Sequence, residues 1–181
     1  MIQRKAYSAL MRLAEQFPIV AITGPRQSGK STLSLAAFPD KKYISFDDKY
    51  YRELAKSNPN DFIKAFPDGL IIDEAQKVPE IFDAIKLSVD TGKYTPGKYI
   101  LTGSSQFRLR QNITDSLAGR IGILKLLPFS IQELKEAGML PDDPYDLFFK
   151  GLYPPLNDPE KLFFLDDWFE NYIDTYLDLD V

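Results

Sequence analysis

The sequence contains no cysteine and no histidine. These absences exclude disulfides, thiolate or imidazole metal ligands, cysteine nucleophiles and histidine general bases. Any acid–base chemistry must therefore use carboxylates, lysine, tyrosine or water. The sequence also lacks a hydrophobic run as long as a membrane span, and its N-terminus lacks the apolar block of a secretory signal. We therefore expect a cytoplasmic protein with no membrane partner.

A strong positive charge is absent as well, since the formal net charge is −4. Residues 1–150 carry 21 basic and 18 acidic residues, a balance of +3, whereas residues 151–181 carry one basic and eight acidic residues, a balance of −7. The acidic end argues against a nucleic-acid groove there, and the weakly basic remainder does not indicate one elsewhere. With 44% hydrophobic residues, the chain of 181 residues is typical of one globular domain, with or without an appendage.

One stretch of the sequence matches the phosphate-binding pattern G-x-x-x-x-G-K-[ST]. Its two glycines allow backbone angles that a Cβ would forbid, so that successive N–H groups can surround phosphate oxygens. Lys30 supplies a mobile positive charge for the β and γ phosphates, and the hydroxyl of Ser31 is placed to hold Mg²⁺. The residues expected to bind the nucleotide are Gly24, Pro25, Arg26, Gln27, Ser28, Gly29, Lys30, Ser31 and Thr32.

The segments on either side of this loop support the same interpretation. Residues 18–22 are apolar and partly β-branched, which predicts a buried parallel strand. Residues 31–37 contain no glycine or proline and predict a helix that ends before Pro39. The N-terminus of that helix, with its partial positive charge, would lie under the phosphates. The sequence therefore predicts a site for ATP and Mg²⁺.

Residues 70–74 are three apolar residues followed by two acids, Asp73 and Glu74. They predict a buried strand that delivers two carboxylates to the carboxyl edge of a sheet. In a phosphate-loop protein the first acid binds Mg²⁺ through water, and the second can activate the attacking water as a general base. The alternative is a strand end that caps a helix over residues 79–91, because such acidic pairs are common.

A further strand is predicted from Tyr99 and ends in small polar residues that include Ser104 and Ser105. These hydroxyls could orient the attacking water or sense the γ-phosphate, or they could form an ordinary serine turn. Arg120 could stabilise the charge that develops during phosphoryl transfer, with a solvated surface arginine as the alternative.

Asp47 and Asp48 follow another predicted strand, residues 42–46, and precede a predicted helix over residues 49–57. They could cap that helix. They could also place a carboxylate at the edge where open α/β sheets bind nucleotides. The sequence does not favour either role.

Alternating strands and helices with the phosphate loop first predict an α/β fold, a three-layer P-loop NTPase with a central parallel five-stranded sheet. We expect a core over residues 1–127, with an N-terminal helix over residues 1–16. A helical extension over residues 128–181 would be the truncated start of a lid or C-terminal domain. Its last helix is expected to begin at Asp158, with Pro159 in the first turn, and to carry a broad apolar stripe. The remaining expected elements are helices 60–66, 130–137 and 145–150, and a strand over residues 121–126.

Five stretches together resemble the AAA+-type ATPases of bacteria and archaea that carry a C-terminal domain of uncharacterised function. They are ITGPRQSGKSTL, LIIDEAQKVPEIF, YILTGSSQF, SLAGRIGILKLLPFS and GLYP, and the resemblance spans nearly the whole chain. It implies an AAA+ (ASCE-type) sheet in which the sensor strand separates the Walker B strand from the phosphate-loop strand. It also implies Glu74 as catalytic base, Ser104 or Ser105 as sensor, and Arg120 as the arginine-finger candidate.

The sequence departs from this family at its end. The long helix of the family ends near an Arg-Asp pair, whereas Leu179 precedes Asp180 here. The C-terminal domain of the family is also missing from this sequence. We expect that domain of the same protein to be a partner of the ATPase domain.

These features predict Mg²⁺-dependent ATP binding and hydrolysis by a domain that serves a larger protein as a motor or switch. ATP, the absent C-terminal domain and further copies of the chain are the expected partners. One alternative is an ATP-dependent interaction module with little turnover. Another is a nucleotide or small-molecule kinase, which would normally lack the Asp73-Glu74 pair and would need an arginine-rich lid. A GTP switch is disfavoured because neither N-K-x-D nor D-x-x-G occurs.

Overall fold

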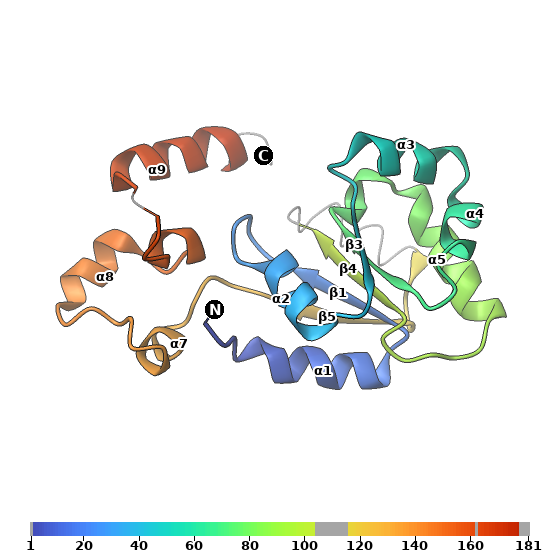
Figure 1. Ribbon diagram of the computed structural model, residues 1–181, viewed down its shortest axis with the longest axis horizontal. Coiled ribbons are helices and arrows are strands. Elements are labelled where there is room, and N and C mark those ends of the chain that lie inside the picture. Colours follow the sequence, from blue (N-terminus) through green and yellow to red (C-terminus); the bar gives the residue numbers. More distant parts are fainter. Residues whose placement is uncertain (1, 104–115, 162, 178–181) are drawn as a thin grey trace.

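The computed structural model describes residues 2–103, 116–161 and 163–177 (Figure 1). At its centre lies a five-stranded sheet with the strand order β2-β3-β4-β1-β5, in which all neighbouring strands are parallel. The order places β4 between β1 and β3, which confirms the arrangement that the family resemblance implied. The strands are β1 (Ile19–Thr23), β2 (Lys42–Ser45), β3 (Leu70–Asp73), β4 (Tyr99–Gly103) and β5 (Ile121–Lys125).

Helices cover both faces of the sheet and form the expected three layers. Successive side chains of a strand point to opposite faces, so Ile19 packs into one core cluster and Val20 into the other. Residues of β1, β3 and β4 are almost fully buried, as expected of strands covered on both faces. One face packs against α1 (Ala6–Gln16) and α2 (Lys30–Ala37), and the other against α3 (Lys49–Ser57), α4 (Pro59–Lys64) and α5 (Glu80–Thr91).

The N-terminal helix is shorter than expected, because α1 begins at Ala6 rather than at residue 1. Arg4 lies before the helix, where its guanidinium donates to the buried carboxylate of Glu133 at 3.1 Å. The backbone N–H of Lys5 donates to the same carboxylate at 2.7 Å. These long-range bonds hold the first residues outside the helical path.

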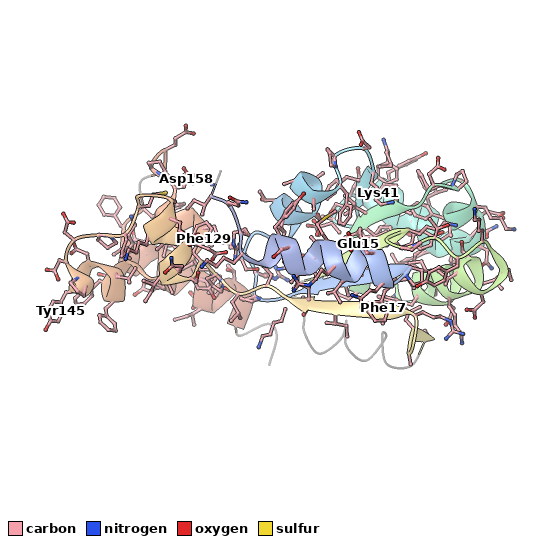
Figure 2. All side chains as sticks on the ribbon, turned by 90° about the horizontal axis from the view of Figure 1, so that it is seen from below. Glu15, Phe17, Lys41, Phe129, Tyr145 and Asp158 are labelled. Atoms are coloured by element: carbon pink, nitrogen blue, oxygen red, sulfur yellow. The ribbon has the colours of Figure 1, made fainter. Side chains whose placement is uncertain are left out.

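After β5 the described chain forms helices only, and residues 128–177 are called the helical extension below. Figure 1 shows it beside the sheet, with the N-terminus of the chain between α1 and α7. Figure 2 shows Phe129 where the extension meets α1, and Tyr145 at the outer end of the extension. The helices are α7 (Ile131–Glu136), α8 (Pro144–Lys150), the 3-10 helix η2 (Pro154–Asn157) and α9 (Leu165–Tyr172), and a π-helical turn over Ile173–Leu177 follows α9.

The prediction of a long helix from Asp158 is wrong, because α9 begins only at Leu165. The carboxylate of Asp158 accepts a hydrogen bond from the N–H of Glu160 at 3.1 Å, and its carbonyl accepts one from Lys161 at 3.1 Å. This turn satisfies the local backbone groups without continuing into a helix.

Part of the apolar stripe of α9 is buried within the extension itself. Trp168 and Tyr172 stack with ring centroids 5.0 Å apart and pack against Tyr153 and Leu156. The hydroxyl of Tyr172 donates to the carbonyl of Arg26 in the phosphate loop at 3.2 Å. The extension is thereby joined to the loop. No helix in the described part of the chain combines the length and the apolar composition needed to cross a membrane.

The Arg4–Glu133 pair leads to a prediction about acid stability. Burial would raise the pKa of Glu133, but hydrogen bonds from the N–H groups of Ser130 and Lys5, together with Arg4, lower it overall. A carboxyl with a depressed folded-state pKa contributes stability above its ordinary pKa, about 4.3, and that contribution is lost as pH falls through the folded value. At pH 7, Glu133→Gln should lower the free energy of unfolding by about 2 kcal/mol.

Urea unfolding of both proteins between pH 7 and pH 3 measures this difference, which should shrink toward the acid end. A constant difference across that range would contradict the assignment.

Candidate functional site

The phosphate loop joins β1 to α2 and uses its glycines as the sequence predicts. Gly24 has φ 153°, and a Cβ there would lie 2.0 Å from the carbonyl oxygen of Leu126. Gly29 has φ 91° and is the N-cap of α2. Only glycine adopts both conformations without strain. The loop therefore presents the first residues of α2 at the carboxyl edge of the sheet.

Lys30 is the first residue of α2, and its side chain folds back over the loop. Its ammonium donates to the carbonyls of Gly24 at 3.1 Å and Pro25 at 2.7 Å. Burial lowers the pKa of Lys30, and the nearby Glu74 and Asp73 oppose this shift. The loop thus holds a buried cation that would attract a polyanion, and the acidic residues beside it would favour a metal ion bound together with that polyanion.

Asp73 ends β3 and is nearly buried among three hydroxyl groups. Its Oδ2 accepts hydrogen bonds from Ser31 at 3.0 Å and from Tyr43 at 2.7 Å, and its Oδ1 accepts one from Thr102. Burial and the bond to Asp73 raise the pKa of Tyr43, so the phenol stays protonated and donates. The sequence paired Ser31 with Asp73, but it gave no signal for Tyr43.

Glu74 follows β3 in a left-handed conformation with φ 53°, which is rare for a residue with a Cβ. Its Oε2 accepts a hydrogen bond from Nε2 of Gln76 at 2.5 Å. A strained backbone at this point is typical of a functional position. Here the left-handed residue ends the strand direction, and Glu74 lines the same cavity as Lys30 and Ser31.

This cavity has a volume of about 510 Å³ and lies over the phosphate loop. Two further walls complete it, and only the one from the helical extension was not considered from the sequence. Asp47 comes from the turn after β2 and pairs with Lys77, while Asp48 caps α3 by accepting from the N–H of Tyr50 at 2.8 Å. Of the two roles considered for these aspartates, Asp47 thus places a carboxylate at the cavity and Asp48 caps the helix. The helical extension adds the second wall, formed by Pro154, Pro155, Asp158 and Lys161.

A second cavity of about 280 Å³ adjoins the first and shares Gly29, Thr32 and Pro154 with it. It is mainly apolar, because it lies between the first residues of the chain, α2 and Phe129. Its lining outside the shared residues is Ile2, Gln3, Arg4, Tyr7, Leu33, Ala36 and Phe129.

One described site candidate, Arg120, is not part of the lining of either cavity. Ser104, with Ser105, lies outside the described residues. Arg120 precedes β5, whose first residue is in register with Ile19 at the start of β1. The phosphate loop follows the other end of β1, about 13 Å away along the strand. The guanidinium of Arg120 instead forms two hydrogen bonds with Asp90 of α5, at 2.5 and 2.9 Å.

The residues present fit a magnesium ion, which prefers a few carboxylate and hydroxyl oxygens completed by water and phosphate. Ser31 and Asp73 supply such oxygens side by side. No group of three or more carboxylates within the described ranges could hold a metal ion by itself. The site therefore suits a metal ion that phosphate oxygens help to hold.

Comparison with known proteins adds a family and its fold. The AAA domain family model matches residues 16–135. Uncharacterised proteins of Mycobacterium bovis and Mycobacterium tuberculosis are each 28% identical over 180 residues, which cover 99% of this chain and 40% of each relative. The chain thus spans 40% of the length of these curated relatives.

Solved structures share the fold at low sequence identity. A Walker-type ATPase of Pyrococcus abyssi aligns with a TM-score of 0.59 and 20% identity, covering 97% of this chain and 72% of that one. A signal-transduction ATPase with a tetratricopeptide-repeat sensor from Pyrococcus horikoshii gives 0.57 and 18%, covering 97% and 32%. AMPPCP-bound DnaA of Aquifex aeolicus gives 0.52 and 19%, covering 87% and 59%.

Proposed function

The chain belongs to the AAA domain family, and on that premise we propose that it binds ATP with Mg²⁺ and hydrolyses it. The observation that carries the proposal is the meeting of two segments 42 residues apart. Ser31, at the head of α2, donates to Asp73, at the end of β3, with Lys30 and Glu74 on the same cavity. Phosphate, metal and water each have a suitable partner there.

The first residues of α2 bind the phosphates. Their N–H groups lie at the positive end of the helix, and Lys30 adds a full charge at the β and γ phosphates. Ser31 and Asp73 would hold Mg²⁺, which when bound neutralises charge on the phosphate oxygens. Tyr43 and Thr102 keep the Asp73 carboxylate in place through their hydroxyls.

Glu74 is the general base of the proposal, and it removes a proton from the attacking water. It lies on the cavity wall, and the amide of Gln76 restrains its carboxylate. The absence of histidine and cysteine from the whole sequence leaves a carboxylate as the natural base at neutral pH.

The adjoining apolar cavity is the proposed site of the nucleobase. It lies directly beside Gly29 and Thr32, so a ligand whose phosphates occupy the larger cavity can place a flat ring in the smaller one. Tyr7, Leu33 and Phe129 provide apolar and aromatic surface for that ring.

Binding and turnover test this function separately. Calorimetry with ATP, with and without Mg²⁺, tests the site, and phosphate release tests hydrolysis. Tight binding without phosphate release would favour an interaction module, and transfer of phosphate to an added small molecule would favour a kinase. Failure to bind ATP or ADP would overturn the proposal.

A motor or switch role belongs to the proposal for the whole protein, because this chain spans 40% of its curated relatives. The contacts between the helical extension and the loop support such a role. Tyr172 reaches the carbonyl of Arg26, and Lys161 lines the cavity. A change at the phosphates would thus reach the extension, and through it any attached domain.

Arg120 leads to a prediction that separates action within one chain from action between chains. Arg120 lies at the edge of the sheet opposite to the phosphate loop, and it pairs with Asp90. Arg120→Ala should therefore leave the ATP affinity and turnover of the dilute monomer within about twofold of wild type. If copies assemble and Arg120 reaches a neighbouring site, the turnover of the assembly should fall by about 10³-fold.

Measurements below and above the assembly concentration distinguish these cases. Mixing Arg120→Ala with Glu74→Gln should restore activity in mixed assemblies, because one subunit then offers an intact Arg120 to an intact Glu74. Wild-type turnover by assembled Arg120→Ala would end any catalytic role for it.

A further inference from the structure

Arg4 makes more contacts with distant parts of the chain than its place before α1 would suggest. Its Nη1 donates to the carbonyl of Ser28 at 2.8 Å, inside the phosphate loop. Its Nη2 donates to the carbonyls of Leu127 at 2.6 Å and Pro128 at 3.3 Å, and its Nε donates to Glu133 at 3.1 Å. The side chain is only 10% exposed. One guanidinium thus joins the N-terminal segment, the loop and the helical extension.

The bond to Ser28 acts on the peptide that joins Ser28 to Gly29. In a trans peptide the C=O and N–H groups point in opposite directions. Because Arg4 holds the carbonyl of Ser28, it fixes the direction of the Gly29 N–H on the other side of the peptide plane. Gly29 lies in the cavity lining, and its φ of 91° belongs to a residue with wide conformational freedom. An external bond is therefore a means of holding this amide in place.

Arg4 is in turn positioned by the extension. Glu133, 4% exposed, accepts from Arg4, from the N–H of Lys5 at 2.7 Å and from the N–H of Ser130 at 2.7 Å. The last bond is part of the capping box that begins α7. The ring of Phe129 lies under the guanidinium, 4.9 Å from its centre. A displacement of α7 would therefore displace Arg4.

We propose that Arg4 is a positioning residue for the phosphate loop, and that the Arg4–Glu133 pair makes nucleotide affinity depend on where the helical extension sits. This inference rests on the proposed function, because it takes a nucleotide as the ligand of the loop. Coupling of this kind is reciprocal: if a docked extension strengthens nucleotide binding, bound nucleotide also strengthens the docking of the extension.

The test uses Arg4→Met, Arg4→Lys and Glu133→Gln in the 181-residue chain, with Lys5→Met as the matched control. Lys5 is the next residue, and its ammonium pairs with Glu136 while both side chains are more than half exposed. Calorimetry should show about a tenfold or greater loss of ADP and ATP affinity for Arg4→Met. Arg4→Lys keeps the charge but cannot reach all four acceptors, and it should show an intermediate loss. Lys5→Met should bind as wild type does.

Hydrogen exchange tests the coupling itself, because a purely structural role of Arg4 would not remove the effect of ADP on the exchange rates of the α7 amides. ADP should slow exchange of the α7 amides in wild type and in Lys5→Met. In folded Arg4→Met, saturated with ADP, that protection should be lost. Without nucleotide, the amides of residues 28–30 should exchange faster in Arg4→Met than in wild type, whether or not the protein proves to bind ATP.

The outcomes separate this inference from the proposed function. Failure of the wild-type protein to bind nucleotide would overturn the proposed function, and the inference with it. Binding by wild type that needs Lys30, together with unchanged affinity and unchanged exchange in folded Arg4→Met, would overturn the role of Arg4 alone. If Arg4→Met does not fold, wild-type affinity in folded Arg4→Lys and Glu133→Gln would overturn it.

Discussion

Replacing Glu74 with glutamine is expected to reduce ATP turnover by about 10² to 10⁴-fold while ATP affinity stays within a few-fold of wild type. A positioned general base contributes on this scale, and glutamine keeps the size of the side chain without its basicity. Glu74 lines the cavity and accepts from the amide of Gln76 at 2.5 Å, and the side-chain oxygen of glutamine can accept the same bond. Single-turnover phosphate release at saturating ATP measures the chemical step, and calorimetry measures the affinity.

Asp73→Asn is the matched comparison, because it makes the same chemical change one residue earlier. It should weaken binding mainly in the presence of Mg²⁺, since Asp73 faces Ser31 at 3.0 Å. Wild-type hydrolysis by Glu74→Gln would remove Glu74 as the base. Equal loss of affinity in both variants would indicate that Glu74 binds rather than activates.

Replacing Lys30 with alanine is expected to lower ATP affinity by about 100-fold or more, because two charge-assisted hydrogen bonds to phosphate are worth roughly 3 kcal/mol together. The ammonium of Lys30 is buried beside Gly24 and Pro25, so it needs no large movement to meet a phosphate there. Calorimetry measures the loss directly, and the thermal shift produced by a fixed ATP concentration should shrink in parallel.

Lys41→Ala is the control for this substitution. Lys41 is also a lysine whose pKa burial lowers, but it precedes β2 at the opposite edge of the sheet and donates to the carbonyls of Asp68 and Lys98. Its loss should leave ATP affinity unchanged. Wild-type affinity in a folded Lys30→Ala protein would remove the phosphate loop from the proposed site.

The sheet was predictable because its signals are local. Each buried strand is a short apolar run, and the glycines of the loop mark its turns, so strand identity followed from residues next to one another in sequence. The order β3-β4-β1 came from family resemblance rather than from the runs themselves. Ser31 and Asp73 were paired in advance because each belongs to a recognisable motif, and the structure places them 3.0 Å apart.

The remainder of the site depends on contacts that no local pattern encodes. Tyr43 meets Asp73 across two neighbouring strands, and a tyrosine in a β-strand is unremarkable in sequence. Arg4 falls within the helix that the sequence predicts over residues 1–16, because nothing near it in the sequence indicates its partner Glu133, 129 residues away. The helix expected from Asp158 is wrong although its signal is local. An aspartate followed by a proline often starts a helix, but here the aspartate carboxylate accepts from the N–H of Glu160 in a turn that does not continue into a helix.

Residues near both ends of the described chain donate to carbonyls of the phosphate loop, Arg4 to that of Ser28 and Tyr172 to that of Arg26. During synthesis the ribosome releases the loop and all five strands well before Tyr172 emerges. The sheet can then form from its own residues, while the loop still lacks its bond from Tyr172. On a growing chain, we therefore expect the fold to precede the finished binding site.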